Sequence, residues 1–521
     1  MDEHRNREQP SRRAVMITGA ALAATAARAA PTARSRLTLH AEQTLNELPA
    51  DFNGFSVELA QLSDPAYYDA GNTSLVALHR RLSAHGVLRL GGNTSETCYW
   101  KSSPEVRPPE IKIPGQGRAD NFMPQRFTAI TPEAVTNLRG FLDACGWNCI
   151  YGLNFGTGSP ERDAEEAAFV ANALGPKLLY FQIGNEPDLY KTSNNLLRPP
   201  GWDYADYFRE WLAIAEAILA RAPQAKFGGP DVTITAADWI KRFAREAPAA
   251  LNGRVVGLSG HYYASGPPQS PEVNIAKLLK PAPAIARLAD VFMPAAHAAN
   301  LPFRITEANS CYRGGKPGMS NALASALWGG DYMLEMAALG SKGINFHGGL
   351  GKMVAASVGD KLPGARNAAD RETARLGVFY SPFAGNRSEG FSARPLFYAM
   401  MLVEQFAGTR LIASSFDAAG ANATAYGAKT ADGFRVAVFN KDAARDLDLA
   451  IDLPVPARRA SVWRLTGPRL DATSGVTLAG AEVAHGSAAW RPENVPALPG
   501  GERRLTVSVP HASAALVFAE G

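Results

Sequence analysis

Cysteine is scarce in this 521-residue chain, which contains four: Cys98, Cys145, Cys149 and Cys311. They form no C-x-x-C pair and have no histidine at zinc-ligand spacing, so the sequence predicts neither a disulfide-rich scaffold nor a structural zinc site. Cys98 and Cys311 each follow a strand predicted below. A disulfide between them and two packed free thiols both fit that placement.

Long apolar runs and a strong charge excess are also missing. Beyond the first 29 residues no run of about 18 apolar residues occurs, so no transmembrane span is predicted. The net charge of +4 is too small and too evenly spread to favour binding of nucleic acid. A length of 521 residues with 46% hydrophobic and 20% charged residues is typical of a soluble globular protein with two domains, one of them large.

Residues 1–29 have the pattern of an export signal rather than of folded structure. Paired arginines, Arg12 and Arg13, precede the uncharged stretch from Thr18 to Ala27, and Ala27-Arg28-Ala29 offers a small-residue cleavage site. This order favours the twin-arginine route, and we expect a protein exported to the periplasm or secreted. A disordered tail rich in alanine and arginine is the alternative.

Strand and helix patterns alternate from about residue 50 to residue 400. The predicted strands are Phe52–Ala60, Val87–Gly92, Cys149–Phe155, Leu178–Glu186, Lys226–Asp231, Val256–Tyr263, Phe303–Asn309 and Gly343–Gly349. The predicted helices are Leu75–Ala84, Pro132–Cys145, Glu161–Leu174, Trp202–Arg221, Ala236–Ala247, Ile275–Ala299 and Asn321–Leu339. Eight such units predict a (β/α)8 TIM barrel over residues 50–400, in preference to an open sheet.

The composition changes after a helix predicted near Arg394–Phe406. The segments 434–440, 447–451, 460–465 and 505–509 alternate apolar and polar residues, which predicts an antiparallel β-sandwich. Arg36–His40 alternates too and could pair with that sheet. The predicted sandwich domain therefore comprises residues 30–49 and 401–521.

Two stretches within the barrel region lack periodicity. Lys101 to Gln125 contains five prolines and follows the second strand, and Gly351 to Asn386 follows the eighth. Loops of this length are commonly functional or disordered, and both fall on the face where a barrel carries its chemistry.

Two of the predicted strands end in glutamates that suit glycoside hydrolysis. The fourth ends Gly184-Asn185-Glu186-Pro187 and the seventh ends Thr306-Glu307. The active site of a barrel lies at the carboxyl ends of its strands, and paired carboxylates are the apparatus of a glycosidase. We predict Glu186 as acid/base, Glu307 as nucleophile and Asn185 as partner of the sugar 2-hydroxyl. For either glutamate alone, a simple ion pair is the competing interpretation.

Further candidates lie near the same strand ends. Tyr262 or Tyr263 could bond to Glu307 and hold it ionised. Glu58 and Asn93 could bind sugar hydroxyls. The loop Tyr312-Arg313-Gly314-Gly315 joins a phenol, a cation and glycines, and could receive an anion.

Together, Gly184-Asn185-Glu186-Pro187, His261-Tyr262-Tyr263, Glu307 and Tyr312-Arg313-Gly314-Gly315 resemble the heparanase and β-glucuronidase family of retaining glycoside hydrolases. The resemblance covers the chain beyond the export signal and implies a barrel followed by a β-sandwich that an N-terminal strand completes. It also implies that a glucuronate carboxylate is held by the backbone near Gly314 and by tyrosine hydroxyls, with Tyr312 and Tyr380 as candidates.

Two other functions stay open at this point. An arabinofuranosidase or xylosidase would share the Asn-Glu barrel, and a non-catalytic carbohydrate-binding barrel would share only the scaffold. The expected partner is a carbohydrate, one containing uronic acid if the resemblance holds. No metal or organic cofactor is predicted, because positioned carboxylates suffice for this chemistry.

Overall fold

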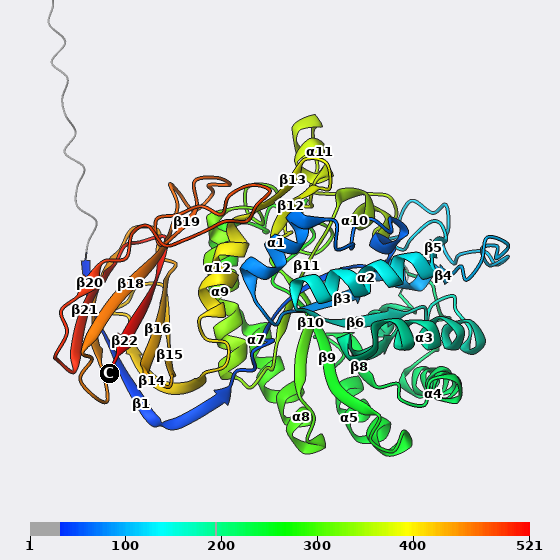
Figure 1. Ribbon diagram of the computed structural model, residues 1–521, viewed down its shortest axis with the longest axis horizontal. Coiled ribbons are helices and arrows are strands. Elements are labelled where there is room, and N and C mark those ends of the chain that lie inside the picture. The colour runs from blue at the N-terminus through cyan, green and yellow to red at the C-terminus, as the bar shows by residue number, and fades with distance from the viewer. Residues whose placement is uncertain (1–31, 193–194) are drawn as a thin grey trace, which may run out of the picture.

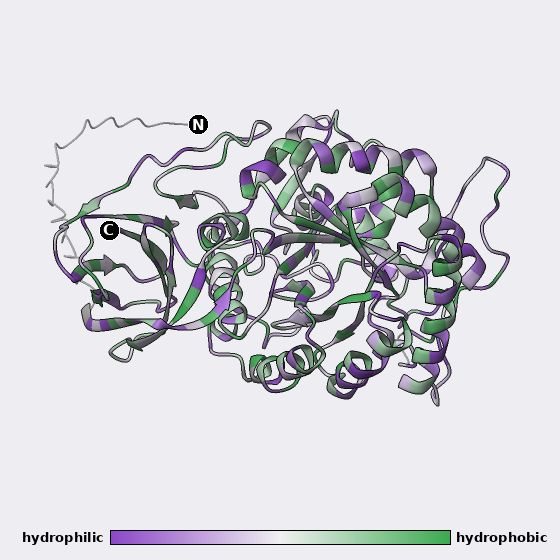
Figure 2. Cartoon of the chain, turned by 60° about the horizontal axis from the view of Figure 1, so that its bottom comes forward, coloured by the Kyte–Doolittle hydropathy of each residue, from purple (hydrophilic) through white to green (hydrophobic). Residues whose placement is uncertain are grey.

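The computed structural model describes residues 32–192 and 195–521. The predicted export signal, residues 1–29, lies outside the described residues. Figure 1 shows a barrel ringed by helices beside a strand-rich domain. Figure 2 shows the same division from a second direction, with helices around the central strands. In the described part of the chain, no helix has the length and apolarity needed to cross a bilayer.

Eight parallel strands close into the predicted barrel, in the order β10-β11-β2-β3-β6-β7-β8-β9. They are β2 (Asn53–Glu58), β3 (Val87–Gly91), β6 (Asn148–Leu153), β7 (Leu178–Ile183), β8 (Phe227–Thr233), β9 (Val255–Tyr263), β10 (Phe303–Asn309) and β11 (Ile344–Gly348). All eight predicted strands are confirmed within a few residues. Their apolar side chains are almost wholly buried, as expected when helices cover a parallel sheet.

Helices cover the barrel strands. Six of them are α1 (Thr73–Leu82), α2 (Pro132–Cys145), α3 (Pro160–Leu174), α4 (Tyr204–Arg221), α5 (Ala237–Ala250) and α9 (Leu323–Ala338). Three of these six, α2, α3 and α4, begin at a side-chain N-cap. The side chain of Thr131 accepts from the Ala134 N–H, and that of Ser159 accepts from the Arg162 N–H. In both helices proline occupies the first position, where its missing N–H costs no helical bond.

The single helix predicted over Ile275–Ala299 is wrong. The chain forms α6 (Ile275–Leu278), α7 (Pro283–Arg287), a π-helical turn (Leu288–Phe292) and α8 (Met293–Ala299). Pro281 lies between α6 and α7, and Pro294 lies at the start of α8. Neither can donate the N–H that a continuous α-helix requires: the helix is interrupted at Pro281, whereas at Pro294 the chain stays helical by way of the π-helical turn that leads into α8.

The C-terminal strands and the N-terminal strand β1 (Thr32–Glu47) make one ten-stranded sheet, in the order β19-β18-β22-β16-β15-β14-β1-β17-β21 with β20 beside β18. The other strands are β14 (Arg410–Asp417), β15 (Ala423–Lys429), β16 (Gly433–Asn440), β17 (Asp446–Asp452), β18 (Arg459–Thr466), β19 (Thr477–Leu478), β20 (Ala497–Leu498), β21 (Arg504–Val509) and β22 (Ser513–Glu520). The sheet curls around its own apolar core, so a mostly antiparallel sandwich-like domain forms as predicted. One pairing differs from a purely antiparallel sheet, because β1 lies parallel to β17.

Helices α9 and α12 (Pro395–Glu404) separate the barrel from this sheet domain (Figure 1). Asp331 of α9 anchors the junction: it forms an ion pair with Lys441 and accepts a hydrogen bond of 2.7 Å from the Tyr426 hydroxyl. These two contacts join α9 of the barrel to β15 and the end of β16 in the sheet domain.

The two irregular stretches meet above the barrel. Residues 101–127 form a loop without helix or strand between β4 (Cys98–Trp100) and β5 (Thr128–Ile130). The second stretch contains α10 (Gly351–Ser357), α11 (Ala368–Arg375) and the start of the hairpin β12 (Phe383–Asn386) and β13 (Gly390–Ala393). Lys361 donates to the carbonyls of Ala119 and Asn121 at 2.6 and 3.0 Å, which ties the two stretches together.

The four cysteines are buried and free. No disulfide joins Cys98 to Cys311, so these two cysteines are packed free thiols, the second of the two arrangements that the sequence allowed.

Candidate active site

A cavity of about 390 Å³ opens at the carboxyl ends of the barrel strands. Eight of the residues predicted from the sequence line it: Glu58, Asn93, Glu186, Tyr263, Glu307, Tyr312, Arg313 and Tyr380. Phe122, Thr233, His261 and His347 complete much of its wall. The structure therefore brings together side chains from seven of the eight strand ends and from both irregular stretches.

Three predicted residues do not line the cavity. Tyr262 points out of the barrel and stacks on Tyr332 of α9, with ring centroids 4.8 Å apart, because neighbouring residues of a strand face opposite sides. Asn185 is buried behind Asn93, to which its side-chain amide donates at 2.9 Å. Gly314 is packed beneath the loop near Leu362, and its carbonyl accepts the N–H of Tyr380 at 3.4 Å.

Glu307 is surrounded by donors and positive charge. Its Oε1 accepts from the Tyr263 hydroxyl at 2.7 Å, and its Oε2 accepts from Arg89 Nη1 at 2.8 Å. His347 lies 3.6 Å from the same Oε2. Burial by itself raises the pKa of Glu307, but His347, His261, Arg89 and the bond from Tyr263 outweigh it and lower that pKa to about 2. Glu307 is therefore an ionised carboxylate that is largely buried from solvent.

Glu186 occupies a different setting at the end of β7. Its backbone adopts a left-handed φ of 48°, unusual for a residue other than glycine, and its N–H donates to the Asp231 carbonyl at 3.0 Å. Oε1 lies 3.0 Å from Nδ1 of His261, whereas Oε2 has no hydrogen-bond partner among the described residues. A carboxylate oxygen of Glu186 lies within 4.8 Å of one of Glu307. One oxygen of Glu186 is thus anchored and the other is left to the cavity.

Arg89 lies beneath the site and joins Glu307 to Asp231. It is 1% exposed and donates to Gln182 Oε1 at 3.0 Å, to Asn185 Oδ1 at 2.8 Å and to Asp231. Asp231 also accepts from Gln182 Nε2 at 2.6 Å and from Thr306. Burial opposes the charge of Asp231, but Arg89 and His261 keep its pKa far below the usual range. The buried cation is therefore shared between two carboxylates, which fixes the strand ends relative to one another.

His261 carries a positive charge between the same groups. Burial lowers its pKa, but Asp231 and Glu307, together with bonds to Asp231 and Glu186, raise it to about 10. His261, Glu186 and Glu307 lie close enough together to resemble a metal-ligand set. His261 lies between the two carboxylates, with Nδ1 3.0 Å from Glu186 Oε1 and Nε2 3.1 Å from Asp231 Oδ1, which is the geometry of an ion-paired imidazolium.

Glu58 and Asn93 are already bonded to the protein. Glu58 Oε2 accepts from the N–H and the hydroxyl of Thr94 at 3.0 and 2.8 Å, and its Oε1 lies 3.2 Å from His347 Nε2. Asn93 accepts from Asn185 and donates to the Ser357 carbonyl at 3.2 Å. Both residues line the cavity with part of their hydrogen-bonding capacity left over.

The mouth of the cavity carries an aromatic ring between two cations. Arg313 places its guanidinium 3.4 Å from the ring centre of Phe122, and Lys361 Nζ lies 4.6 Å from the same centre. Within the described residues Arg313 forms no ion pair. Tyr312 packs its ring against Gly266, where a side chain would collide with it. The loop after β10 thus brings a phenol and a half-buried cation to the rim.

Comparison with known proteins points to the glycosidases. No protein-family model matches the chain. A curated protein of Aspergillus niger named β-glucuronidase is 26% identical over 323 residues, 57% of this chain and 58% of that protein. Another β-glucuronidase, from Neurospora crassa, is 28% identical over 285 residues, half of each chain. The chain therefore spans little more than half the length of the curated relatives it matches.

Solved structures share the fold over almost the whole chain. A 4-O-α-L-rhamnosyl-β-D-glucuronidase from Fusarium oxysporum 12S superposes with a TM-score of 0.67 at 17% identity, covering 94% of this chain and 99% of that one. An arabinofuranosidase from Xanthomonas axonopodis pv. citri superposes with a TM-score of 0.61 at 16% identity, covering 93% and 99%. At these identities the likeness shows the fold, a TIM barrel followed by a β-domain.

Several residues of the site were not singled out from the sequence. Arg89 stands inside the apolar run Val87-Leu88-Arg89-Leu90, and a lone charge in a buried strand requires a buried counter-charge. Asp231 and His347 end the fifth and eighth barrel strands, a position that is itself a signal. Phe122 lies in the long proline-containing loop, where nothing in the sequence distinguishes it.

Proposed function

We propose that this protein is a retaining β-glucuronidase, which releases β-linked glucuronic acid from glucuronides or from chains of the glycosaminoglycan type. The observation that carries the proposal is the facing pair Glu186 and Glu307, with carboxylate oxygens within 4.8 Å, in a cavity whose rim bears a cation without an acidic partner among the described residues. Carboxyl groups about 5–5.5 Å apart suit double displacement, whereas inverting enzymes leave room for a water between them.

In the first step Glu307 attacks the anomeric carbon. Arg89, His347 and Tyr263 keep it ionised, so it is ready to act without losing a proton. The sugar–oxygen bond breaks as a bond from the anomeric carbon to Glu307 forms, and the intermediate is a glycosyl ester.

Glu186 serves both steps as acid and then as base. Oε2, which is free of protein partners among the described residues, delivers a proton to the leaving oxygen and later removes one from water. Oε1 stays anchored on His261, so the carboxyl group keeps its orientation while its charge changes. The predicted bond from Asn185 to the sugar 2-hydroxyl would use its second amide hydrogen, and it requires Asn93, behind which Asn185 is buried, to move aside.

The uronic carboxylate is assigned to the loop after β10. A full charge leaving water needs hydrogen bonds or a cation to offset its desolvation. Arg313 supplies the cation, and Tyr312 and Tyr380 supply hydroxyls on the cavity wall. Arg313, Gly314 and Gly315 all have positive φ, and of the three only Arg313 lines the cavity, so its backbone N–H is the main-chain donor that we assign to the carboxylate. A turn that directs backbone N–H groups outward suits an anion.

A neutral-sugar glycosidase, such as an arabinofuranosidase or xylosidase, is the second candidate, favoured by the arabinofuranosidases that share the fold. A non-catalytic carbohydrate-binding barrel is less well supported, because both glutamates are present and adjacent. Nitrophenyl β-glucuronide, β-glucoside, α-arabinofuranoside and β-xyloside distinguish the three. Preferred cleavage of the glucuronide, with the β-anomer detected first by NMR, is the expected result.

Tyr312→Phe tests the carboxylate assignment. One lost hydrogen bond to a charged group is worth about 1.5–3 kcal/mol, so we expect kcat/KM on the glucuronide to fall about ten- to a hundredfold. The matching glucoside serves as the control and should be affected far less. An equal loss on both substrates would favour the neutral-sugar enzyme.

A further inference from the structure

Glu96 is a fully buried carboxylate that touches the segment carrying Glu186. It lies in the short 3-10 helix Asn93–Thr97 that follows β3, and it is 0% exposed. Among the described residues it forms no ion pair with lysine, arginine or histidine. Burial raises its pKa to about 7, although its hydrogen bonds favour the ionised form. A carboxylate kept at such a cost of desolvation calls for a structural or functional reason.

The contacts of Glu96 join three consecutive strand ends of the barrel. Oε1 accepts the N–H of Asn185 at 2.7 Å, just after β7, and Oε2 accepts the N–H of Gly156, just after β6. The hydroxyls of Ser95, at 3.0 Å, and of Tyr190 also bond to it. The two backbone donors come from different loops, and each is held by a separate oxygen of the Glu96 carboxylate.

The segment that Glu96 holds is irregular. Gly184 and Glu186 both have positive φ, at 90° and 48°, on either side of Asn185. A residue such as Glu186 keeps a left-handed backbone only where its surroundings fix it. The N–H of Asn185 is held by Glu96 and the N–H of Glu186 by the Asp231 carbonyl. These two bonds determine where the Glu186 side chain leaves the backbone.

We propose that Glu96 is a positioning residue for the acid/base: through the N–H of Asn185 it fixes the turn that directs Glu186 Oε1 to His261 and Oε2 to the leaving oxygen. The inference rests on the proposed function for its kinetic consequence. A glutamine at this position has one acceptor oxygen and one NH₂, and the NH₂ must face one of the two backbone N–H groups. Glu96→Gln therefore loses one of the two clamps.

The test is the leaving-group dependence of catalysis, measured on whichever sugar the wild type cleaves. A displaced acid harms substrates with poor leaving groups most, because activated ones need little protonation. Glu96→Gln should lower kcat on an alkyl or phenyl glycoside about ten- to a hundredfold, the range for one lost charged hydrogen bond, and spare the dinitrophenyl glycoside. In a Glu186→Ala background the same substitution should have no further effect.

Glu166→Gln is the matched control. Glu166 is also a buried carboxylate whose pKa burial raises to about 7, and it bonds to the Tyr151 hydroxyl at 2.7 Å without touching the Asn185–Glu186 segment. The Glu166→Gln substitution should leave the dependence of kcat on the leaving group unchanged. An equal loss on all leaving groups in Glu96→Gln, or additivity with Glu186→Ala, overturns the proposal.

Two further measurements test the role of Glu96 if Glu96→Gln does not fold or if the wild type has no glycosidase activity. If Glu96→Gln does not fold, Tyr190→Phe removes a hydroxyl that bonds to Glu96 and lies 3.3 Å from the N–H of Asn185, and it should give the same pattern at smaller size. If the wild type cleaves no glycoside, the proposed function fails by itself. A crystal structure of Glu96→Gln then decides, because an unchanged contact between Glu186 and His261 contradicts positioning by Glu96.

Discussion

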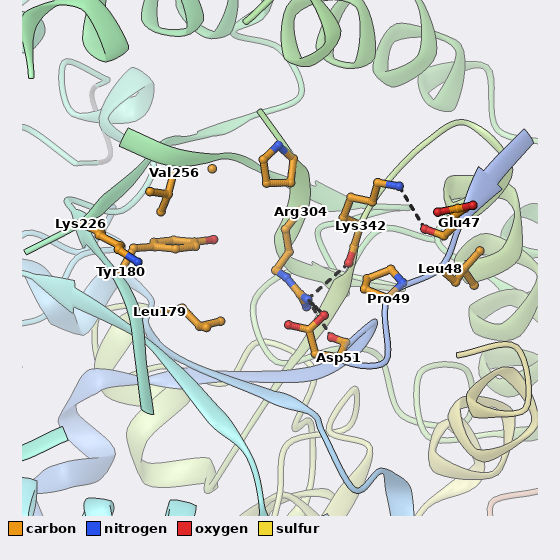
Figure 3. A pocket seen from close by; sticks show the side chains of 12 residues that line it. Glu47, Leu48, Pro49, Asp51, Leu179, Tyr180, Lys226, Val256, Arg304 and Lys342 are labelled. Carbon is orange, nitrogen blue, oxygen red and sulfur yellow. Dashed lines mark hydrogen bonds and ion pairs between the residues drawn. The ribbon is translucent and has the colours of Figure 1, made fainter. Parts of the chain in front are cut away.

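The two ends of the barrel each hold a cavity and a buried arginine, but they use the arginine differently. At the amino end a cavity of about 640 Å³ is lined by Tyr180, Lys226, Arg304 and Lys342 (Figure 3). Arg304 donates there to the Asp51 carbonyl at 2.7 Å and to Asn345 Oδ1 at 3.2 Å. At the carboxyl end Arg89 donates to Glu307, Asp231 and the side chain of Asn185.

The difference lies in the acceptors. Most acceptors of Arg304 are neutral oxygens at the starts of the strands, with one Asp51 oxygen at 3.4 Å, so the arginine closes the barrel floor. The acceptors of Arg89 include two buried carboxylates, whose charge states it sets. The larger of these two cavities therefore lies at the amino end of the barrel, where Arg304 stabilises the fold. The smaller one lies at the carboxyl end, where the paired carboxylates are, as expected for a TIM barrel.

Glu307→Gln should have the largest effect and be confined to the carboxyl end. An amide cannot form the glycosyl ester, so we expect kcat to fall on the order of 10⁴-fold or more while the variant stays folded. Circular dichroism provides the control, and a fluorinated glycoside that traps the intermediate should label Glu307 in the wild type. Labelling at a different carboxylate would reassign the nucleophile.

Glu186→Ala should come next. Loss of general acid–base catalysis costs about 10²–10⁴-fold, with the first step least affected for activated leaving groups. Azide should restore turnover and yield a glycosyl azide of retained configuration. An inverted azide, or a loss independent of the leaving group, would remove Glu186 from the acid/base role.

Arg304→Met should have the smallest effect and separate the two ends. Loss of its hydrogen bonds should lower the free energy of unfolding by about 1.5–3 kcal/mol, with kcat close to that of the wild type. Arg89→Met is the matched variant at the other end and should impair kcat as well as stability. Urea unfolding and initial rates measure both quantities, and a loss of kcat in Arg304→Met would show that the two ends are coupled.

The barrel was predictable because its strands are apolar runs of the right length, separated by segments with helical periodicity, some of which begin at an N-cap. The facing glutamates were predictable because strand ends have a known place in this fold. Arg89, Asp231 and Glu96 were not predicted, since each acts through partners 89–218 residues away in the chain, and a sequence does not show which buried charges meet. The sequence left open which of Tyr262 and Tyr263 contacts Glu307, because the phase of a strand decides which of two adjacent tyrosines faces inward; the structure places Tyr263 there.

Strand β1 has a consequence for the order in which the molecule can form. It pairs antiparallel with β14 and parallel with β17, as in Arg36 with Asp417 and Leu37 with Ile451, separations of 417 − 36 = 381 and 451 − 37 = 414 residues. During synthesis β1 is made before the barrel, and it stays unpaired until its partners β14 and β17 have been made after the barrel. Completion of the sheet is therefore a late, long-range step. A nascent or truncated chain that lacks residues 410–452 would expose β1 as an unpaired strand, which can pair with other chains and aggregate.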